Sequence, residues 1–182
     1  NFIDDDITSL LGNSNINYII QMNFFMKMLK ILKVDKEVES DTFKKYTADI
    51  LKGFNIENEE NISENSEFYI KSFEGYNESS MSKYSYIFEN YIVNFIYNNT
   101  FPFNEVMSFF DSYIMLLVRF SFIRFYLVGL YLNDSNESPE KLAEFIQVFS
   151  KTIEHHRSYL IDSLAYIKRN EFDNMEFVKT LL

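Results

Sequence analysis

Two amide side chains stand four residues apart in a largely apolar segment, ENYIVNFIYNNTFPF, which covers residues 89–103. Residues at this spacing lie on one side of a helix, so Asn90, Asn94 and Tyr97 form a polar stripe. Such side chains either hydrogen-bond to a neighbouring helix and fix its position or bind a polar ligand. The spacing is compatible with both roles.

The chain has two histidines, His155 and His156, directly after Glu154. Neighbouring residues on a helix point about 100° apart. The two imidazoles therefore cannot share one metal ion as an i, i+4 pair does. Glu154 and His155 have the chemistry of an acid–base pair, but no nucleophile accompanies them. His156 continues the apolar row of Phe149 and Ile153, which favours a hydrogen-bonded histidine in the core.

Composition excludes several classes of site. A chain without cysteine has no disulfide, no thiolate nucleophile and no cysteine ligands for zinc or an iron–sulfur cluster. Its 4 glycines form neither a P-loop nor a GxGxxG pattern, so this chain alone does not build a Rossmann-type nucleotide site. The net charge of −10, without a basic stripe, argues against nucleic acid as a partner. No catalytic centre and no metal site follow from these residues.

Hydrophobic periodicity predicts an all-α domain of seven or eight helices without a sheet. Hydrophobic residues make up 47% of the 182 residues, enough for a substantial core. No segment shows the alternation that is typical of a half-buried strand. The expected helices cover residues 16–33, 41–53, 68–76, 82–98, 104–133, 139–156, 159–168 and 177–182.

Polar residues mark several helix ends. Ser40 and Asp41 offer an N-cap for the second of these helices, and Gly53 suits its C-terminus. Asp173 and Glu176 have the spacing of a capping box before the last helix.

An acidic, asparagine-rich segment at about 55–67 is the weakest candidate for regular structure. We expect it to lie within an N-terminal helical segment, residues 1–80. Residues 81–182 are then expected to form a C-terminal helical core.

The most hydrophobic segment, Ile114–Leu132, is long enough to cross a membrane. Arg119 and Arg124 fall in its middle, where each charge costs roughly 2.5–3.5 kcal/mol on insertion scales. We therefore expect a helix in the protein core and no membrane partner. Buried arginines need carboxylates or a route to water, and Glu89 and Asp111 are the expected partners.

The order of the segments resembles the C-terminal region of the flagellin lysine-N-methylase family. That family tends to show E-N-Y-[LI]-x-N-[YF] followed by F-P-F, and this chain has ENYIVNF and then FPF. It also tends to show S-K-x-x-E-H, which is SKTIEH here, and a short last helix like FVKTLL. The resemblance covers approximately Tyr84–Leu182, while the first 80 residues match loosely.

The resemblance implies an enzyme that methylates lysine side chains of flagellin, with S-adenosylmethionine as the methyl donor. It also implies an N-terminal cysteine cluster that holds iron–sulfur or another metal, from which this cysteine-free chain departs. We expect the chain to be the C-terminal helical domain of a longer, cytoplasmic bacterial methyltransferase and to be inactive alone. Within that enzyme it is expected to recognise the substrate or to complete the core as a scaffold.

If the domain carries a substrate site, the resemblance favours Asn90, Tyr91 and Asn94 facing Glu154 and His155. The alternative is a non-catalytic helical module for protein–protein interaction. An exposed apolar groove on the methionine-rich helix Met22–Leu32 would favour that alternative.

Overall fold

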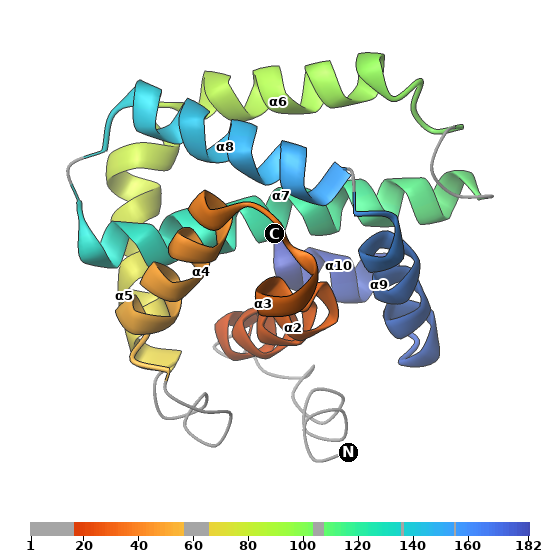
Figure 1. The fold of residues 1–182 in the computed structure, drawn as a ribbon, viewed down its shortest axis with the longest axis horizontal. Helices are drawn as coiled ribbons and strands as arrows, with labels where there is room; N and C mark the ends of the chain where they lie inside the picture. Colours follow the sequence, from red (N-terminus) through yellow and green to blue (C-terminus); the bar gives the residue numbers. More distant parts are fainter. Residues whose placement is uncertain (1–16, 57–65, 104–107, 136, 155) are drawn as a thin grey trace.

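The computed structural model describes residues 17–56, 66–103, 108–135, 137–154 and 156–182. These ranges contain no strand and eight α-helices of seven residues or more, so the predicted all-α fold is confirmed (Figure 1). The one-turn helix α3, Val34–Glu37, and a π-helical segment, Asn77–Met81, complete the described elements. The eight helices are α2 Asn17–Leu32, α4 Asp41–Gly53, α5 Ser66–Tyr76, α6 Ser85–Asn98, α7 Phe109–Asn133, α8 Pro139–Glu154, α9 Arg157–Arg169 and α10 Met175–Leu181.

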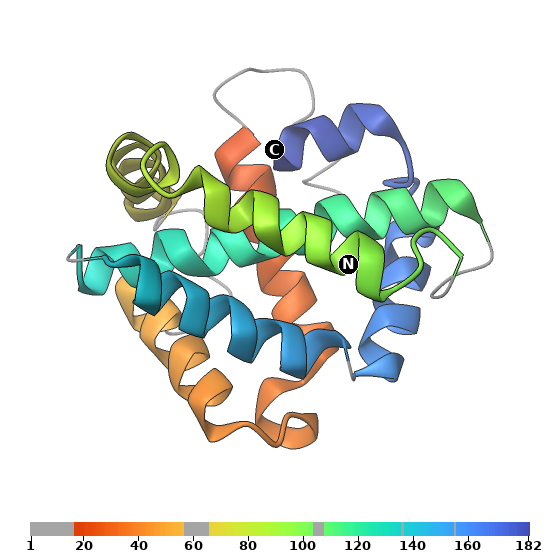
Figure 2. The same cartoon turned by 90° about the horizontal axis from the view of Figure 1, so that it is seen from above.

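Helix α7 is the central element. It packs against α2, α4, α5, α8 and α10, and Figure 2 shows α6 and α8 crossing over one side of it. It is the one helix in the described ranges that is long and apolar enough to cross a membrane, with a mean hydropathy of 1.7 over 18 residues. Because 78% of that window is buried inside the protein, α7 is the core helix that its two arginines predict.

The partner of Arg124 differs from the expected carboxylates. Arg124 donates from Nη2 to the backbone carbonyl of Leu181 at 2.6 Å, and its guanidinium lies 4.8 Å from the ring centroid of Phe73. The last carbonyls of a helix lack partners within the helix, so the end of α10 supplies a natural acceptor. Asp111 instead accepts a hydrogen bond from Lys168 at 2.6 Å. A carboxylate is therefore not needed to bury Arg124.

Side chains from both parts of the chain meet in one hydrophobic core. Phe25 of α2 stacks on Phe122 of α7, with ring centroids 5.4 Å apart and an interplanar angle of 6°. Met22, Met28 and Leu32 of the methionine-rich helix α2 are fully buried and belong to the core. The division of the chain at residue 80 stays a prediction.

Helix α4 crosses α7 at two glycines. A Cβ at Gly129 would lie 2.8 Å from Cβ of Ile50, and a Cβ at Gly53 would lie 2.9 Å from the carbonyl oxygen of Gly129. Only glycine allows the two backbones to approach this closely. Helix α4 ends at Gly53 as predicted, and the residue with positive φ that follows is Asn55, at 54°.

Polar cap residues mark the starts of other helices. Ser40 caps α4 as predicted, accepting a hydrogen bond from the backbone nitrogen of Phe43 at 3.2 Å. Helix α7 begins at Phe109 after the cap residue Ser108, later than the predicted start at residue 104; residues 104–107 lie outside the described ranges.

Helix α10 is capped by Asn174, whose Oδ1 accepts from the backbone nitrogen of Phe177 at 2.8 Å. The cap was predicted at Asp173, one residue earlier. Asp173 and Asn174 both carry a side-chain oxygen of the kind that caps helices, so sequence alone discriminates poorly between them.

We predict that Gly129→Ala destabilises the domain by about 1–3 kcal/mol, because the added methyl group overpacks the contact between α4 and α7. Urea unfolding followed by circular dichroism measures the change in the free energy of unfolding. Gly75→Ala is the matched control in another helix, since its Cβ would meet the partly buried ring of Tyr131 at 3.2 Å. Equal stability losses in both variants would contradict the close crossing.

Candidate functional site

Two hollows flank the C-terminal half of α8. The first, which we call the amide groove, has a volume of about 300 Å³ and lies between α6 and α8. Its lining includes Ile87, Asn90, Tyr91, Asn94, Phe95, Asn98 and Asn99 from α6 and the residue that follows it, and Ala143, Ile146, Gln147, Ser150 and Glu154 from α8.

Helical spacing explains this lining. On α6, Tyr91 and Phe95 turn inward and are buried, while Asn90 and Asn94 precede them by one residue and stay exposed at the groove. On α8, every third or fourth residue faces α6. Two amphipathic helices packed side by side therefore enclose a seam with an apolar floor and a polar rim.

Four of the five predicted site residues line this groove: Asn90, Tyr91, Asn94 and Glu154. The fifth, His155, lies outside the described residues. Tyr97, which shares the predicted polar stripe, is 80% exposed and does not line the groove. Whether the gathered residues bind a substrate stays a prediction.

The amides of Asn90 and Asn94 make no hydrogen bond with any side chain or backbone group that the structure describes. They therefore do not tie α6 to a neighbouring helix within that part of the chain, and each offers a donor and an acceptor to the groove. Below the groove, the guanidinium carbon of the buried Arg119 lies 4.6 Å from the ring centroid of Phe95. This cation–π contact supports the apolar floor from beneath.

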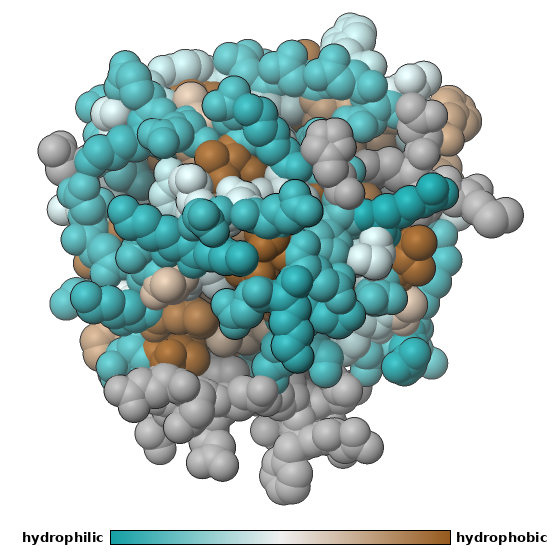
Figure 3. Space-filling model, viewed as in Figure 1, coloured by the Kyte–Doolittle hydropathy of each residue, from teal (hydrophilic) through white to brown (hydrophobic). Residues whose placement is uncertain are grey.

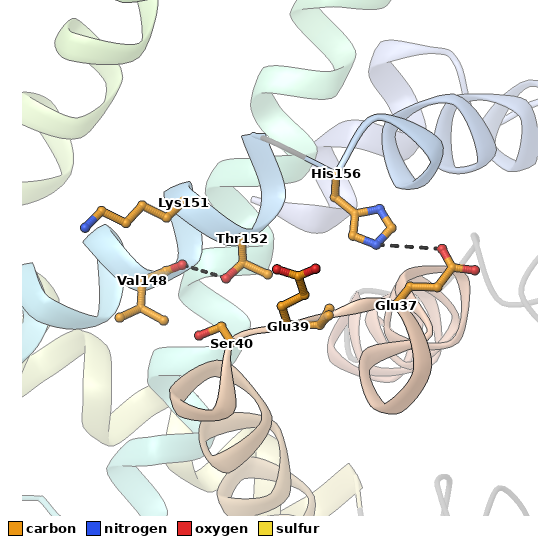
Figure 4. Close-up of a pocket in the computed structure, with 8 residues that line it drawn as sticks. Glu37, Glu39, Ser40, Val148, Lys151, Thr152 and His156 are labelled. Carbon is orange, nitrogen blue, oxygen red and sulfur yellow. Dashed lines mark hydrogen bonds and ion pairs between the residues drawn. The ribbon is translucent and has the colours of Figure 1, made fainter.

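The second hollow, which we call the His156 pocket, has a volume of about 500 Å³ (Figure 4). Residues 37–40, from the last residue of α3 to the N-cap of α4, form one wall, and Val148, Lys151 and Thr152 of α8 form another. His156 closes the end where α8 gives way to α9.

His156 is a helix cap. Its Nδ1 accepts a hydrogen bond from the backbone nitrogen of Tyr159 at 3.2 Å, and its Nε2 lies 3.7 Å from Oε2 of Glu37. A neutral imidazole that accepts at Nδ1 carries its proton on Nε2. Neither ring nitrogen then has a lone pair available for a substrate proton. The His156 side chain is 11% exposed. The prediction continued α8 through His156, but in the structure this residue is the N-cap of α9.

Two glutamates line the pocket, and one of them is paired with a lysine. Lys33 donates a hydrogen bond to Oε1 of Glu37 at 2.6 Å, and this bond lowers the pKa of the Glu37 carboxyl below its ordinary value. Figure 4 shows the Glu39 side chain directed toward α8, whereas Lys151 extends along α8 away from both glutamates. An ammonium group fits this arrangement better than an anion does.

The hydroxyls of the His156 pocket are already engaged. Ser40 caps α4, and Thr152 donates to the carbonyl oxygen of Val148 at 2.9 Å. Within the described ranges, no three His, Cys, Asp or Glu side chains converge as a metal site would require. Among the described residues, the pocket therefore offers the carboxylates of Glu37 and Glu39, without a cluster of metal ligands.

Comparison with known proteins assigns the chain to a family. A family model described as the FliB lysine N-methylase C-terminal domain matches residues 1–181. The chain belongs to this family. No curated protein and no solved structure matches it. The family match extends over the first 80 residues, where the sequence resemblance is loose.

Membership implies S-adenosylmethionine as methyl donor and flagellin as substrate of the full FliB enzyme. The residues described here do not fit the donor in a Rossmann-type site, because Gly53, Gly75 and Gly129 all lie within helices and pack against other residues. A cysteine-free chain also has no thiolates for an iron–sulfur cluster. We therefore derive no chemical step through either group from this domain.

The His156 pocket was not among the predicted sites. Glu37 and Glu39 stand in an ordinary charged stretch, and more than a hundred residues separate them from His156. The cap at Ser40 was the one local signal, because it marks the turn that brings these glutamates beside α8.

We predict that His156→Ala lowers the free energy of unfolding by about 1 kcal/mol, as expected for loss of a helix cap, while His156→Asn retains most of it. Urea unfolding at pH 8 measures both variants. Equal losses for alanine and asparagine would show that the cap at Tyr159 contributes nothing.

Proposed function

We propose that this FliB domain binds the segment of flagellin on which the full enzyme acts, and that the amide groove is its contact surface. One observation carries the proposal: the side-chain amides of Asn90 and Asn94 line a groove, and neither amide has a hydrogen-bond partner in the described residues. Side-chain amides pair well with the N–H and C=O groups of a peptide backbone, because each provides both a donor and an acceptor.

The size of the groove suits a peptide segment. A hollow of about 300 Å³ is at the small end of ligand sites. Its apolar floor at Phe95 and Ile146 offers buried surface to one or two apolar side chains, and the amides give orientation. Glu154 at one end adds a charge that attracts a basic residue of the bound segment.

The His156 pocket supports the same role. Carboxylates at Glu37 and Glu39 attract a lysine ammonium, but methyl transfer requires the neutral amine, aligned with the methyl group. His156 does not accept that proton while it caps α9. We therefore assign recognition to this domain and the chemical step to the rest of the enzyme. A cytoplasmic location belongs to the proposal, since the absence of cysteine suits a reduced compartment.

We predict that Asn94→Ala combined with Glu154→Ala weakens binding of flagellin to the purified domain at least tenfold, because each lost hydrogen bond contributes about 1 kcal/mol and those to a charged group more. Isothermal titration calorimetry measures the dissociation constant, and circular dichroism verifies the fold. Glu74→Ala combined with Asn77→Ala changes the same residue types outside the groove and should leave binding unchanged.

Unchanged affinity in the folded Asn94 and Glu154 double variant would remove the groove from the proposal. A wild-type domain that does not bind flagellin would instead be a scaffold within the FliB enzyme. Parallel titration with S-adenosylmethionine tests the assignment of the chemistry, since donor binding by these helices alone would place part of the reaction centre here.

A further inference from the structure

A third hollow, of about 600 Å³, lies where α2, α3 and α4 meet. We call it the lysine groove, because four of its lining residues are lysines in a chain whose net charge is −10. Figure 3 shows apolar surface between hydrophilic side chains on the face where these three helices lie. The groove is separate from the two hollows beside α8, since it shares no lining residue with them.

The floor of the lysine groove is apolar. Met26 and Leu29 of α2, Val34 of α3 and Leu51 of α4 contribute to it. Met26, Leu29 and Val34 belong to the core cluster and are buried, so the floor is the outer edge of the core and is rigidly supported. A ligand that covers this edge removes further apolar surface from water, which favours binding by about 25 cal/mol per Å².

The rim is positively charged. Lys30, Lys33, Lys36 and Lys44 line the groove, with Asp35 as its one acidic residue. Lys33 is paired with Glu37, whereas Lys36 and Lys44 form no ion pair with any residue that the structure describes. The local charge is therefore opposite in sign to that of the whole protein, so the groove can attract a group that the rest of the surface repels.

We propose that the lysine groove binds an acidic amphipathic helix of a partner protein. An α-helix is about 10 Å across and presents apolar side chains at i, i+3, i+4 and i+7, which suits a groove between helices with an apolar floor. Acidic residues on either side of that row then meet Lys36 and Lys44 at the rim. The positive charge of the rim favours an acidic ligand and repels a lysine-rich substrate segment.

The probe for this proposal is an 18-residue peptide, acetylated and amidated, with leucines at i, i+3, i+4 and i+7 and glutamates beside them. A second peptide carries glutamine at every glutamate position. Fluorescence anisotropy of the labelled peptides with the 182-residue chain measures both dissociation constants at low and at physiological salt. The acidic peptide should bind about tenfold more tightly than the neutral one, with a difference that shrinks as salt screens the charges.

Charge-reversal and groove-filling variants on α3 and α4 test where the peptide binds. Lys36→Glu combined with Lys44→Glu should weaken the acidic peptide by about tenfold or more. Lys45→Glu combined with Lys52→Glu makes the same change in net charge at exposed positions that do not line the groove, and should change affinity less than threefold. Ala48→Phe fills the groove from an exposed position and should weaken both peptides.

Two results would overturn the proposal. Equal effects of the two charge-reversal pairs would show general attraction rather than a groove. Sedimentation that reveals a dimer of this chain, dissociated by Lys36→Glu and Lys44→Glu but not by the control pair, would make a second copy the occupant. Neither charge-reversal pair changes the buried residues of the floor. Circular dichroism verifies that both variants are folded, so either result can be assigned to the changed charges.

Discussion

The burial of α7 is the constraint on which the rest of the domain depends. A helix of 25 residues with apolar side chains around most of its circumference is stable in water only when other helices cover it. Five helices do so, and each contributes an apolar row that matches its own spacing. The same requirement explains the glycines at the crossing with α4 and the carbonyl that α10 offers to Arg124.

Because the core is occupied by α7 and its neighbours, the polar features lie at the seams between outer helices. The amide groove follows the contact of α6 with α8, the His156 pocket follows that of α8 with the turn before α4, and the lysine groove lies beside α2 and α4. None of these hollows reaches a metal-binding cluster in the described residues. Rigid helices hold the side chains that line each hollow in fixed positions.

Hydrophobic periodicity was sufficient to predict the helices, and it also placed Asn90 and Asn94 together. Their meeting with Glu154 was anticipated through family motifs, because no local pattern relates residues 60 positions apart. The arginine partner was not predictable in the same way: a backbone carbonyl leaves no trace in the residue type of Leu181. Gly53 was predicted as the end of α4, where it does lie, but its close approach to α7 follows only from the packing of the two helices.

The position of α8 between two hollows has a consequence for any chain that occupies both. An α-helix is about 10 Å in diameter, and an extended polypeptide advances about 3.3 Å per residue. A segment that leaves the amide groove and crosses α8 therefore uses about three residues before it reaches the His156 pocket. The helix would then act as a ruler, selecting a lysine by its distance along the chain from the residues held in the groove, independently of its immediate neighbours.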